Sequence, residues 1–215
     1  MNSVRVLHLA DVHIGMENYG RLDPATGLNG RVMDFLRRLA GVVDYALENE
    51  VDLVLFAGDA YKSRDPNSTH RREFARRIMR LADAGIPVVL LVGNHDLPAV
   101  SKRASSIEIF DTLRVPNITV ASRDKLHLLT TKKGDQIQVA TVPYPQRQQL
   151  LAHDDHKQKT IAELDELVHQ MVAENIQALA GQVDPSLPAV LVGHFSVSEA
   201  KLGSERSVML GRDIV

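Results

Sequence analysis

The stretch Val88-Val-Leu-Leu-Val-Gly-Asn-His-Asp96 decides the fold of this chain. Its five apolar residues form a continuous run, which is typical of a strand buried on both faces of a parallel sheet. The strand then ends at a cluster of chemically active side chains. The same pattern recurs where apolar residues 4–9, 53–57 and 189–192 lead to Asp11-Val-His13, Gly58-Asp59 and Gly193-His194. We therefore predict that four strand ends meet at one rim, where open α/β sheets place their binding sites.

The side chains at these strand ends are aspartate, asparagine and histidine, which together are ligands for divalent cations. Asp11 and His13 are two residues apart, so in an extended segment both would reach one ion. Asp59 carries two carboxylate oxygens and can bridge two ions. Taken alone, each residue has a structural alternative: a turn or helix cap for Asp11 and Asp59, and an ordinary hydrogen-bonding role for His13 and His194. The joint pattern favours a metal site.

The first half of the chain alternates strands with amphipathic helices. Strands are predicted at residues 4–9, 52–57 and 86–92. Helices are predicted over residues 31–49 and from a cap at Ser68 or Thr69 to about Ala84. This β-α-β-α-β order predicts right-handed crossovers and a largely parallel sheet. Residues 14–30 are rich in glycine and are predicted to form a long loop, and such loops beside strand ends are often functional.

The second half has a different pattern. Short strands are predicted at residues 117–121, 125–131 and 136–142. Lys133-Gly-Asp135 supplies a turn between the last two, so they are expected to form a hairpin. We expect these strands to build a second, more antiparallel sheet. An amphipathic helix is predicted over residues 156–180, ahead of the strand at 189–192.

Length and composition bound the protein class. The chain has 215 residues, enough for one substantial core, so we treat residues 1–215 as a single domain. It contains no cysteine, which excludes disulfides and cysteine-based zinc sites and fits a reducing, cytoplasmic location. No segment approaches the roughly 20 apolar residues of a membrane span, so we expect no membrane partner.

Charge is unevenly distributed, although the formal net charge is only −2. Residues 62–80 are rich in lysine and arginine, with Asp65 and Glu73 as the acidic residues. A basic surface of this kind guides nucleic acid. The alternative is a solvated helix face on which Glu73 and Arg77 form an i,i+4 pair.

In their order along the chain, the four clusters resemble the motifs of the calcineurin-like metallophosphoesterase superfamily. The matching stretches are most similar to the bacterial SbcD DNA-repair exonuclease family: Leu9-Ala-Asp-Val-His-Ile-Gly15, Gly58-Asp-Ala-Tyr-Lys62, Gly93-Asn-His-Asp-Leu-Pro98 and Gly193-His-Phe195. The resemblance extends over essentially the whole chain. It implies an α/β fold, a two-sheet α-β-β-α sandwich, and we expect this chain to lack the C-terminal strands of that sandwich.

The resemblance also implies a role for each motif residue. The expected ligands of two divalent metal ions are Asp11, His13, Asp59, Asn94 and His194, with Asp59 bridging the two ions. A hydroxide held between the ions would attack phosphorus. His95 would contact the scissile phosphate and protonate the leaving oxygen. Asp96 would either orient His95 or cap the next helix. Mixed oxygen and imidazole ligands suit Mn²⁺ best.

Two features depart from the family pattern. The family commonly has histidine or aspartate where this chain has Lys62, whose cation would contact DNA phosphate instead of metal. The family also has a Gly-His-x-His motif that supplies one further histidine to each metal site, and nothing after His194 matches it. We therefore expect a truncated nuclease domain with weak metal binding and little nuclease activity. The closing stretch Gly203-Ser-Glu-Arg-Ser-Val-Met-Leu-Gly211 is similar to the segment that precedes the absent motif.

The leading functional prediction is a metal-dependent exonuclease and endonuclease subunit in double-strand-break repair. The partners that the resemblance implies are DNA, an SMC-like ATPase of the SbcC type and a second copy of the chain. One alternative is a phosphodiesterase that acts on small nucleotides or phosphomonoesters. Another is a non-catalytic binding module with a degenerate metal site. A DNA enzyme is distinguished by binding that weakens steeply with salt.

Overall fold

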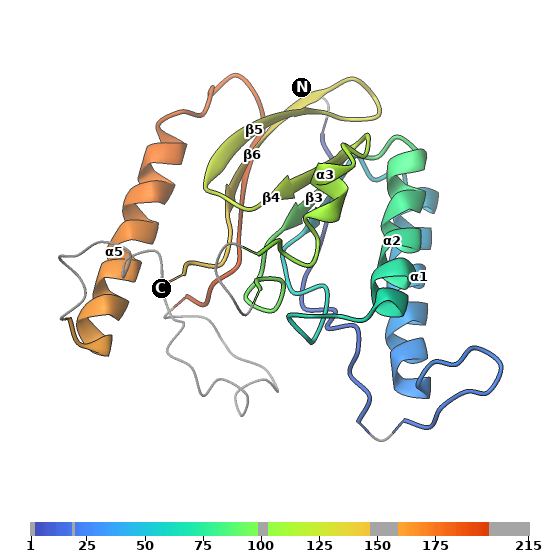
Figure 1. The fold of residues 1–215 in the computed structure, drawn as a ribbon. Coiled ribbons are helices and arrows are strands. Elements are labelled where there is room, and N and C mark those ends of the chain that lie inside the picture. The colour runs from blue at the N-terminus through green and yellow to red at the C-terminus, as the bar shows by residue number, and fades with distance from the viewer. Residues whose placement is uncertain (1–2, 19, 99–102, 147–158, 198–215) are drawn as a thin grey trace.

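The protein forms two β-sheets stacked between helices, as the computed structural model shows (Figure 1). The structure describes residues 3–18, 20–98, 103–146 and 159–197. The first sheet is parallel, in the order β1 (Val6–Leu9), β2 (Leu53–Phe56), β3 (Val88–Leu91) and β4 (Ile118–Ala121). The second sheet has the order β5 (Lys125–Thr130), β6 (Gln136–Val142) and β7 (Ala189–Gly193). Helices α1 (Gly30–Glu48) and α2 (Ser68–Asp83) cover the first sheet, and α5 (Ile161–Ala180) covers the second.

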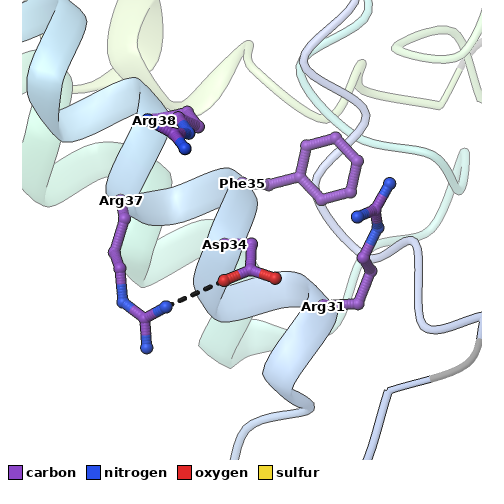
Figure 2. A pocket seen from close by; sticks show the side chains of 5 residues that line it. All are labelled: Arg31, Asp34, Phe35, Arg37 and Arg38. Atoms are coloured by element: carbon purple, nitrogen blue, oxygen red, sulfur yellow. Dashed lines mark hydrogen bonds and ion pairs between the residues drawn. The ribbon is translucent and has the colours of Figure 1, made fainter.

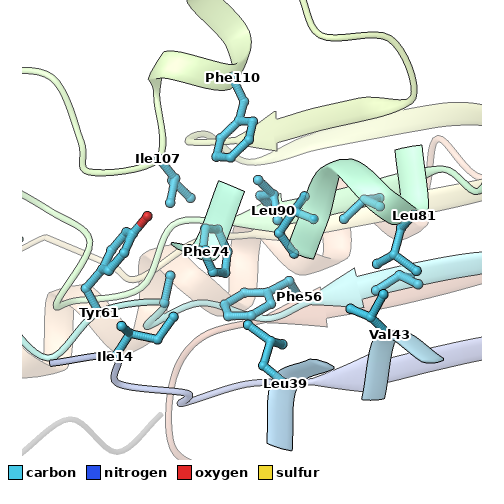
Figure 3. Close-up of a cluster of buried hydrophobic side chains, with 14 of the residues drawn as sticks. Ile14, Leu39, Val43, Phe56, Tyr61, Phe74, Leu81, Leu90, Ile107 and Phe110 are labelled. Carbon is cyan, nitrogen blue, oxygen red and sulfur yellow. The ribbon is translucent and has the colours of Figure 1, made fainter. Parts of the chain in front are cut away.

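Alternation along the strands divides the core into layers. On β2, Val54 and Phe56 pack with the helices, whereas Leu55 packs toward the second sheet. Under the helices, Phe74 of α2 lies edge-on to Phe56 with 5.3 Å between the ring centroids (Figure 3). On the other side of the molecule, Val142 of β6 belongs to the cluster beneath α5. The predicted α-β-β-α sandwich is confirmed.

The helices of the first half begin at asparagine caps. The side chain of Asn29 accepts a hydrogen bond from the backbone N–H of Arg31 at the start of α1. At the start of α2, Asn67 accepts one from the N–H of His70 at 2.9 Å. The prediction of a cap at Ser68 or Thr69 was therefore wrong. Asn67 has the extended backbone that a cap requires, and Ser68 is already helical.

The middle of the chain differs from the prediction in one respect. β4 is not part of the second sheet, because it pairs in parallel with β3 and closes the edge of the first sheet. The short helix α3 (Ile109–Thr112) connects the two strands. Its four residues are too few to show a helical hydrophobic period, so the sequence did not reveal this crossover. The predicted β5–β6 hairpin is confirmed, and β7 joins β6 in parallel.

The arginines of α2 are held by carboxylates. Glu73 is only 9% exposed, and its carboxylate accepts hydrogen bonds from Arg72, Arg76 and Arg77, each at 3.0 Å. Arg77 also donates to the backbone carbonyl of Leu36, which ties α2 to α1. The predicted Glu73–Arg77 pair is therefore present. Burial works to raise the pKa of the Glu73 carboxyl, but the hydrogen bonds from Arg77 and Arg72 outweigh it and hold the pKa below its usual value.

Replacing Glu73 with glutamine should lower the free energy of unfolding by about 1–3 kcal/mol at neutral pH, because three arginines lose their shared carboxylate. The folded-state pKa lies below the unfolded value of 4.5, so the contribution of Glu73 is present above about pH 4.5. It is lost as the pH falls through the folded-state pKa. Urea unfolding at several pH values between acid and neutral measures how far the free energies of unfolding of the variant and the unmutated chain differ. Glu166→Gln, on an exposed face of α5, should change little at any pH, and equal effects of the two variants would contradict the prediction.

Part of the sequence prediction concerns residues outside the described ranges. These are residues 156–158 of the long helix and the stretch from Gly203 to Gly211. The described part of that helix begins later than predicted, at Ile161 of α5, because Thr160 has the extended backbone of an N-cap. In the part of the chain that the structure describes, no helix combines the length and hydropathy needed to cross a membrane.

Candidate metal centre

The predicted strand ends converge, but they come from both sheets. Beyond β1, the backbone continues beside the residues that follow β2: the N–H of Asp11 donates to Gly58 O and that of His13 to Asp59 O, both at 3.1 Å. His194 follows β7 of the second sheet, and its N–H donates to Val142 O at 3.1 Å. The expectation of one sheet rim is therefore corrected. The site lies at the seam between the two sheets.

Three of the converging residues have a left-handed backbone. The φ angles of Asp11, His13 and Asp59 are 56°, 48° and 59°. The segment from Asp11 to His13 is thus not extended, and the argument that residues i and i+2 point the same way does not apply to it. This conformation is unfavourable for residues with a Cβ and is found where surrounding contacts impose it, often at functional sites. The backbone bonds to the residues after β2 supply those contacts.

The first group of ligand atoms contains Asp11, His13 and Asp59. Nε2 of His13 lies 3.5 Å from Oδ1 of Asp11 and 3.7 Å from Oδ2 of Asp59. The hydrogen bond between Asp11 and His13 lowers the pKa of the Asp11 carboxyl and raises that of the His13 imidazole. Asp59 is 2% exposed, whereas Asp11 is open to solvent, so one side of this group is accessible.

The second group contains Asp59, Asn94 and His194. Nε2 of His194 lies 3.1 Å from Oδ1 of Asn94 and 3.6 Å from Oδ1 of Asp59. Nδ1 of the same ring lies 2.6 Å from the carbonyl oxygen of Ala57. A carbonyl can only accept, so Nδ1 carries a proton, and Nε2 of the neutral ring keeps its lone pair for an ion.

Asp59 stands between the two groups, with Oδ2 toward His13 and Oδ1 toward His194. Two sets of three residues each bring their ligand atoms within 4.8 Å of one another. The sets are His13–Asp59–His95 and Asp11–Asp59–His194, so Asp59 belongs to both. Carboxylate, amide and imidazole donors suit Mn²⁺, Fe²⁺ or Zn²⁺. The residues present therefore fit a pair of divalent ions.

His95 lies beside these groups and is held by the backbone. Its ring Nδ1 lies 2.6 Å from the carbonyl oxygen of Lys62. Its backbone N–H donates a hydrogen bond to Oδ1 of Asp59 at 2.9 Å. Its ring is edge-on to that of His13, with 5.0 Å between the centroids. The Lys62 carbonyl places the proton of the neutral ring on Nδ1 and leaves Nε2 for a ligand. The Lys62 side chain is exposed, and its Nζ lies 3.6 Å from Sδ of Met16.

Asp96 does neither of the two things predicted for it. It is fully buried, and its carboxylate accepts hydrogen bonds from the backbone N–H groups of Asp59, Ala60 and Gly93 and from the hydroxyl of Ser106. Burial raises its pKa to about 6. Asp96 therefore ties together the loops that follow β2 and β3, and it positions Asp59 through its backbone.

Three features of the site were not predicted from the sequence, namely two contacts to backbone carbonyls and one aromatic ring. Ala57 and Lys62 fix the rings of His194 and His95 through carbonyl oxygens, which every residue carries, so no residue type marks them. Tyr144, whose ring centroid lies 6.2 Å from that of His194, was also missed. Tyr144 lies two residues after the end of β6, and this position near a strand end is the one sequence feature that indicated a place in the site.

Sequence comparisons relate the chain to known phosphoesterases and nucleases. Residues 4–214 match the family model for calcineurin-like phosphoesterases. The chain is 30% identical over 98 residues to the DNA double-strand break repair protein Mre11 of Sulfurisphaera tokodaii, covering 46% of this chain and 24% of that protein. It is 27% identical over 150 residues to the SbcD subunit of the nuclease SbcCD of Bacillus subtilis, covering 68% and 35% respectively.

The chain thus spans about a quarter to a third of the length of these curated relatives. Among solved structures, it is similar to the protein TT1561 of Thermus thermophilus, with a TM-score of 0.49 and 13% identity over 94% of this chain and 72% of that one. The family match covers nearly all of the chain, including every residue of the candidate metal centre. The chain belongs to the calcineurin-like phosphoesterase family.

Proposed function

We propose that this chain hydrolyses phosphodiester bonds in DNA with the help of two divalent metal ions. The observation that carries the proposal is the position of Asp59, whose two carboxylate oxygens face different histidines. Asp11 and His13 would hold one ion, Asn94 and His194 the other, and Asp59 both. When bound, the ions would supply Lewis acidity toward the phosphate and lower the pKa of water. The mixed donor set favours Mn²⁺ as the ion to test first.

The chain's own residues orient the reaction. His95 is held by the Lys62 carbonyl at Nδ1, so its Nε2 is the atom that contacts the phosphate. In the protonated ring, Nε2 donates a proton to the leaving oxygen while the Lys62 carbonyl stabilises the charge at Nδ1. Asp96 keeps the two loops in register, which holds Asp59 in place. The open side at Asp11 admits the substrate.

The names of the relatives favour DNA as the substrate. One is a DNA double-strand break repair protein, and the other is a subunit of a nuclease. As a subunit, the second relative is one part of a complex. By analogy, we propose that this chain also works with an SMC-like ATPase and that it acts in DNA repair.

Two substrates test the proposal. The chain is incubated with Mn²⁺ and either linear duplex DNA or bis(p-nitrophenyl) phosphate, and matched reactions contain EDTA. The expected result is slow cleavage of both substrates, which EDTA abolishes. Hydrolysis of the small diester by a chain without salt-dependent DNA affinity would identify a phosphodiesterase for small nucleotides. Failure to bind Mn²⁺ in calorimetry would leave a non-catalytic module and overturn the proposal.

The role of His95 gives a separate prediction. His95→Gln should lower kcat by roughly 10²–10⁴-fold, because the proton donor at the leaving oxygen is removed. Mn²⁺ affinity should stay within a few-fold of the unmutated chain, since His95 is not among the proposed ligands. Calorimetry and steady-state kinetics on the same preparations separate the two effects. A loss of Mn²⁺ binding comparable to the loss in rate would make His95 a ligand and contradict the assignment.

A further inference from the structure

Helix α1 carries an arginine-rich hollow on its exposed face. Arg31, Asp34, Phe35, Arg37 and Arg38 line a cavity of about 530 Å³ (Figure 2). A neighbouring cavity of about 680 Å³ shares three of these residues and extends across the 14–29 loop. Its further lining residues are Met16, Asn18, Gly20, Arg21 and Gly30. We call Arg21, Arg31, Arg37 and Arg38 the arginine surface.

The arginine surface carries excess positive charge. Of the described residues that line either cavity, only Asp34 is acidic, and it pairs with Arg37 at 2.8 Å. Among the residues that the structure describes, no carboxylate lies within ion-pair distance of Arg21, Arg31 or Arg38. On α2, by contrast, the arginines at 71, 72, 76, 77 and 80 all have carboxylate partners. Of these two helices, α1 with its preceding loop therefore offers more unpaired positive charge to an anionic ligand than α2 does.

This surface lies next to the candidate metal centre at Met16. Met16 lines the larger cavity, and its N–H donates to the carbonyl oxygen of His13 at 3.3 Å. The cationic Nζ of Lys62 lies 3.6 Å from Sδ of the same methionine. A ligand that occupies the metal centre can thus continue past Lys62 and Met16 onto Arg21 and Arg31.

We propose that the arginine surface binds the phosphodiester backbone of a DNA strand whose scissile bond lies at the metal centre. The inference rests on the proposed nuclease function and adds the path of the substrate. Guanidinium groups bind phosphate through two parallel hydrogen bonds. Arg31 already lies over the ring of Phe35, 5.1 Å from its centroid, and this pair offers a flat surface on which a base can stack (Figure 2).

The length of the surface matches several phosphates. Arg31 and Arg38 are separated by seven residues of α1, or about 10.5 Å along the helix axis. One strand of B-DNA advances about 3.4 Å per phosphate, so this distance spans roughly three phosphates. A single small anion would use only part of such a surface.

The test compares two charge-matched double variants. Binding of a fluorescein-labelled DNA duplex is followed by fluorescence anisotropy in EDTA, between about 50 and 200 mM NaCl, so that the measurement is independent of the metal centre. Arg31→Gln with Arg38→Gln should weaken binding roughly 5- to 30-fold and reduce the slope of log K against log[NaCl] by about 1.8. Arg114→Gln with Lys132→Gln should have little effect, because both residues lie at the opposite ends of the strands from the site.

A second variant should act in the opposite direction. Asp34→Asn removes the carboxylate that lines both cavities and releases Arg37, so DNA binding should become about 2- to 5-fold tighter. If α1 had only a structural role, Asp34→Asn would not make DNA binding tighter. Equal losses in the two double variants, or weaker binding by Asp34→Asn, would overturn the inference. So would an unmutated chain that shows no salt-dependent DNA binding, and in that case hydrolysis of the small diester would still test the metal centre by itself.

Discussion

Replacing Asp59 with asparagine is expected to abolish the pairwise binding of divalent ions and to reduce hydrolysis by at least about 10³-fold. Asp59 is common to both candidate ligand groups, and it is 2% exposed. Asparagine keeps the shape of the side chain but offers one neutral oxygen in place of two charged ones. Neither group would then retain its central ligand.

The loss should not be caused by unfolding. The charge of Asp59 raises the pKa of the buried Asp96, so removing that charge relieves a repulsion inside the site. We expect the free energy of unfolding to change by no more than about 1 kcal/mol. Titration calorimetry with Mn²⁺ measures how many ions each chain binds, and urea unfolding measures the free energy of unfolding. Asp44→Asn is the control, because Asp44 is a half-buried aspartate of α1 that pairs with Arg80 far from the site. Two ions bound by Asp59→Asn with unchanged affinity would rule out the bridging role.

Gly58→Ala should be strongly disruptive, because it adds a methyl group at a close approach of three loops. Gly58 has φ +97°, and a Cβ there would lie 2.9 Å from the backbone of Gly93 and 2.5 Å from Nδ1 of His194. The added methyl would separate the loop after β2 from the loop after β3, and it would displace His194 of the second sheet. We expect a loss of about 3–5 kcal/mol in stability from strained backbone and overpacking together. Binding of metal ions should fall as well, because His194 leaves its carbonyl partner.

The chain contains a matched control for this substitution. Gly27 also has a positive φ, +68°, but a Cβ there would meet nothing within 4 Å. Gly27→Ala therefore reports the backbone strain alone, about 1–2 kcal/mol. Urea denaturation and Mn²⁺ titration of both variants separate strain from collision. Similar losses for the two variants would show that the approach of Gly58 to Gly93 and His194 is not tight.

The regular elements of the fold were predictable because their side chains repeat at strand or helix spacing. The parallel strands β1, β2 and β3 and the two helices between them follow from such repeats. The place of β4 did not follow. Three of its four residues are half-buried, and the connection from β3 contains a helix of only four residues. Partner choice was decided by tertiary packing, which leaves no local pattern in the sequence.

The candidate site was predictable in its members but not in its construction. Ligand types at strand ends are visible in the sequence, and the structure brings Asp11, His13, Asp59, Asn94 and His194 together. How they meet depends on left-handed backbone and on carbonyl groups, neither of which a residue type announces. Burial explains the error over Asp96. An exposed aspartate caps a helix, whereas a fully buried one must find several donors of its own, and here they lie on two neighbouring loops.

The seam position of the site has a consequence for folding. His194 reaches the carbonyl of Ala57 across 137 residues of sequence, and that contact joins the last described strand to the second. Loop closure over such a distance is slow, so these ligands assemble only after the two sheets have docked. Ions that bind the assembled site and not its separate halves then stabilise the docked state by mass action. Bound ions would therefore hold the two sheets together, and the stability of the docked state would rise with the ion concentration.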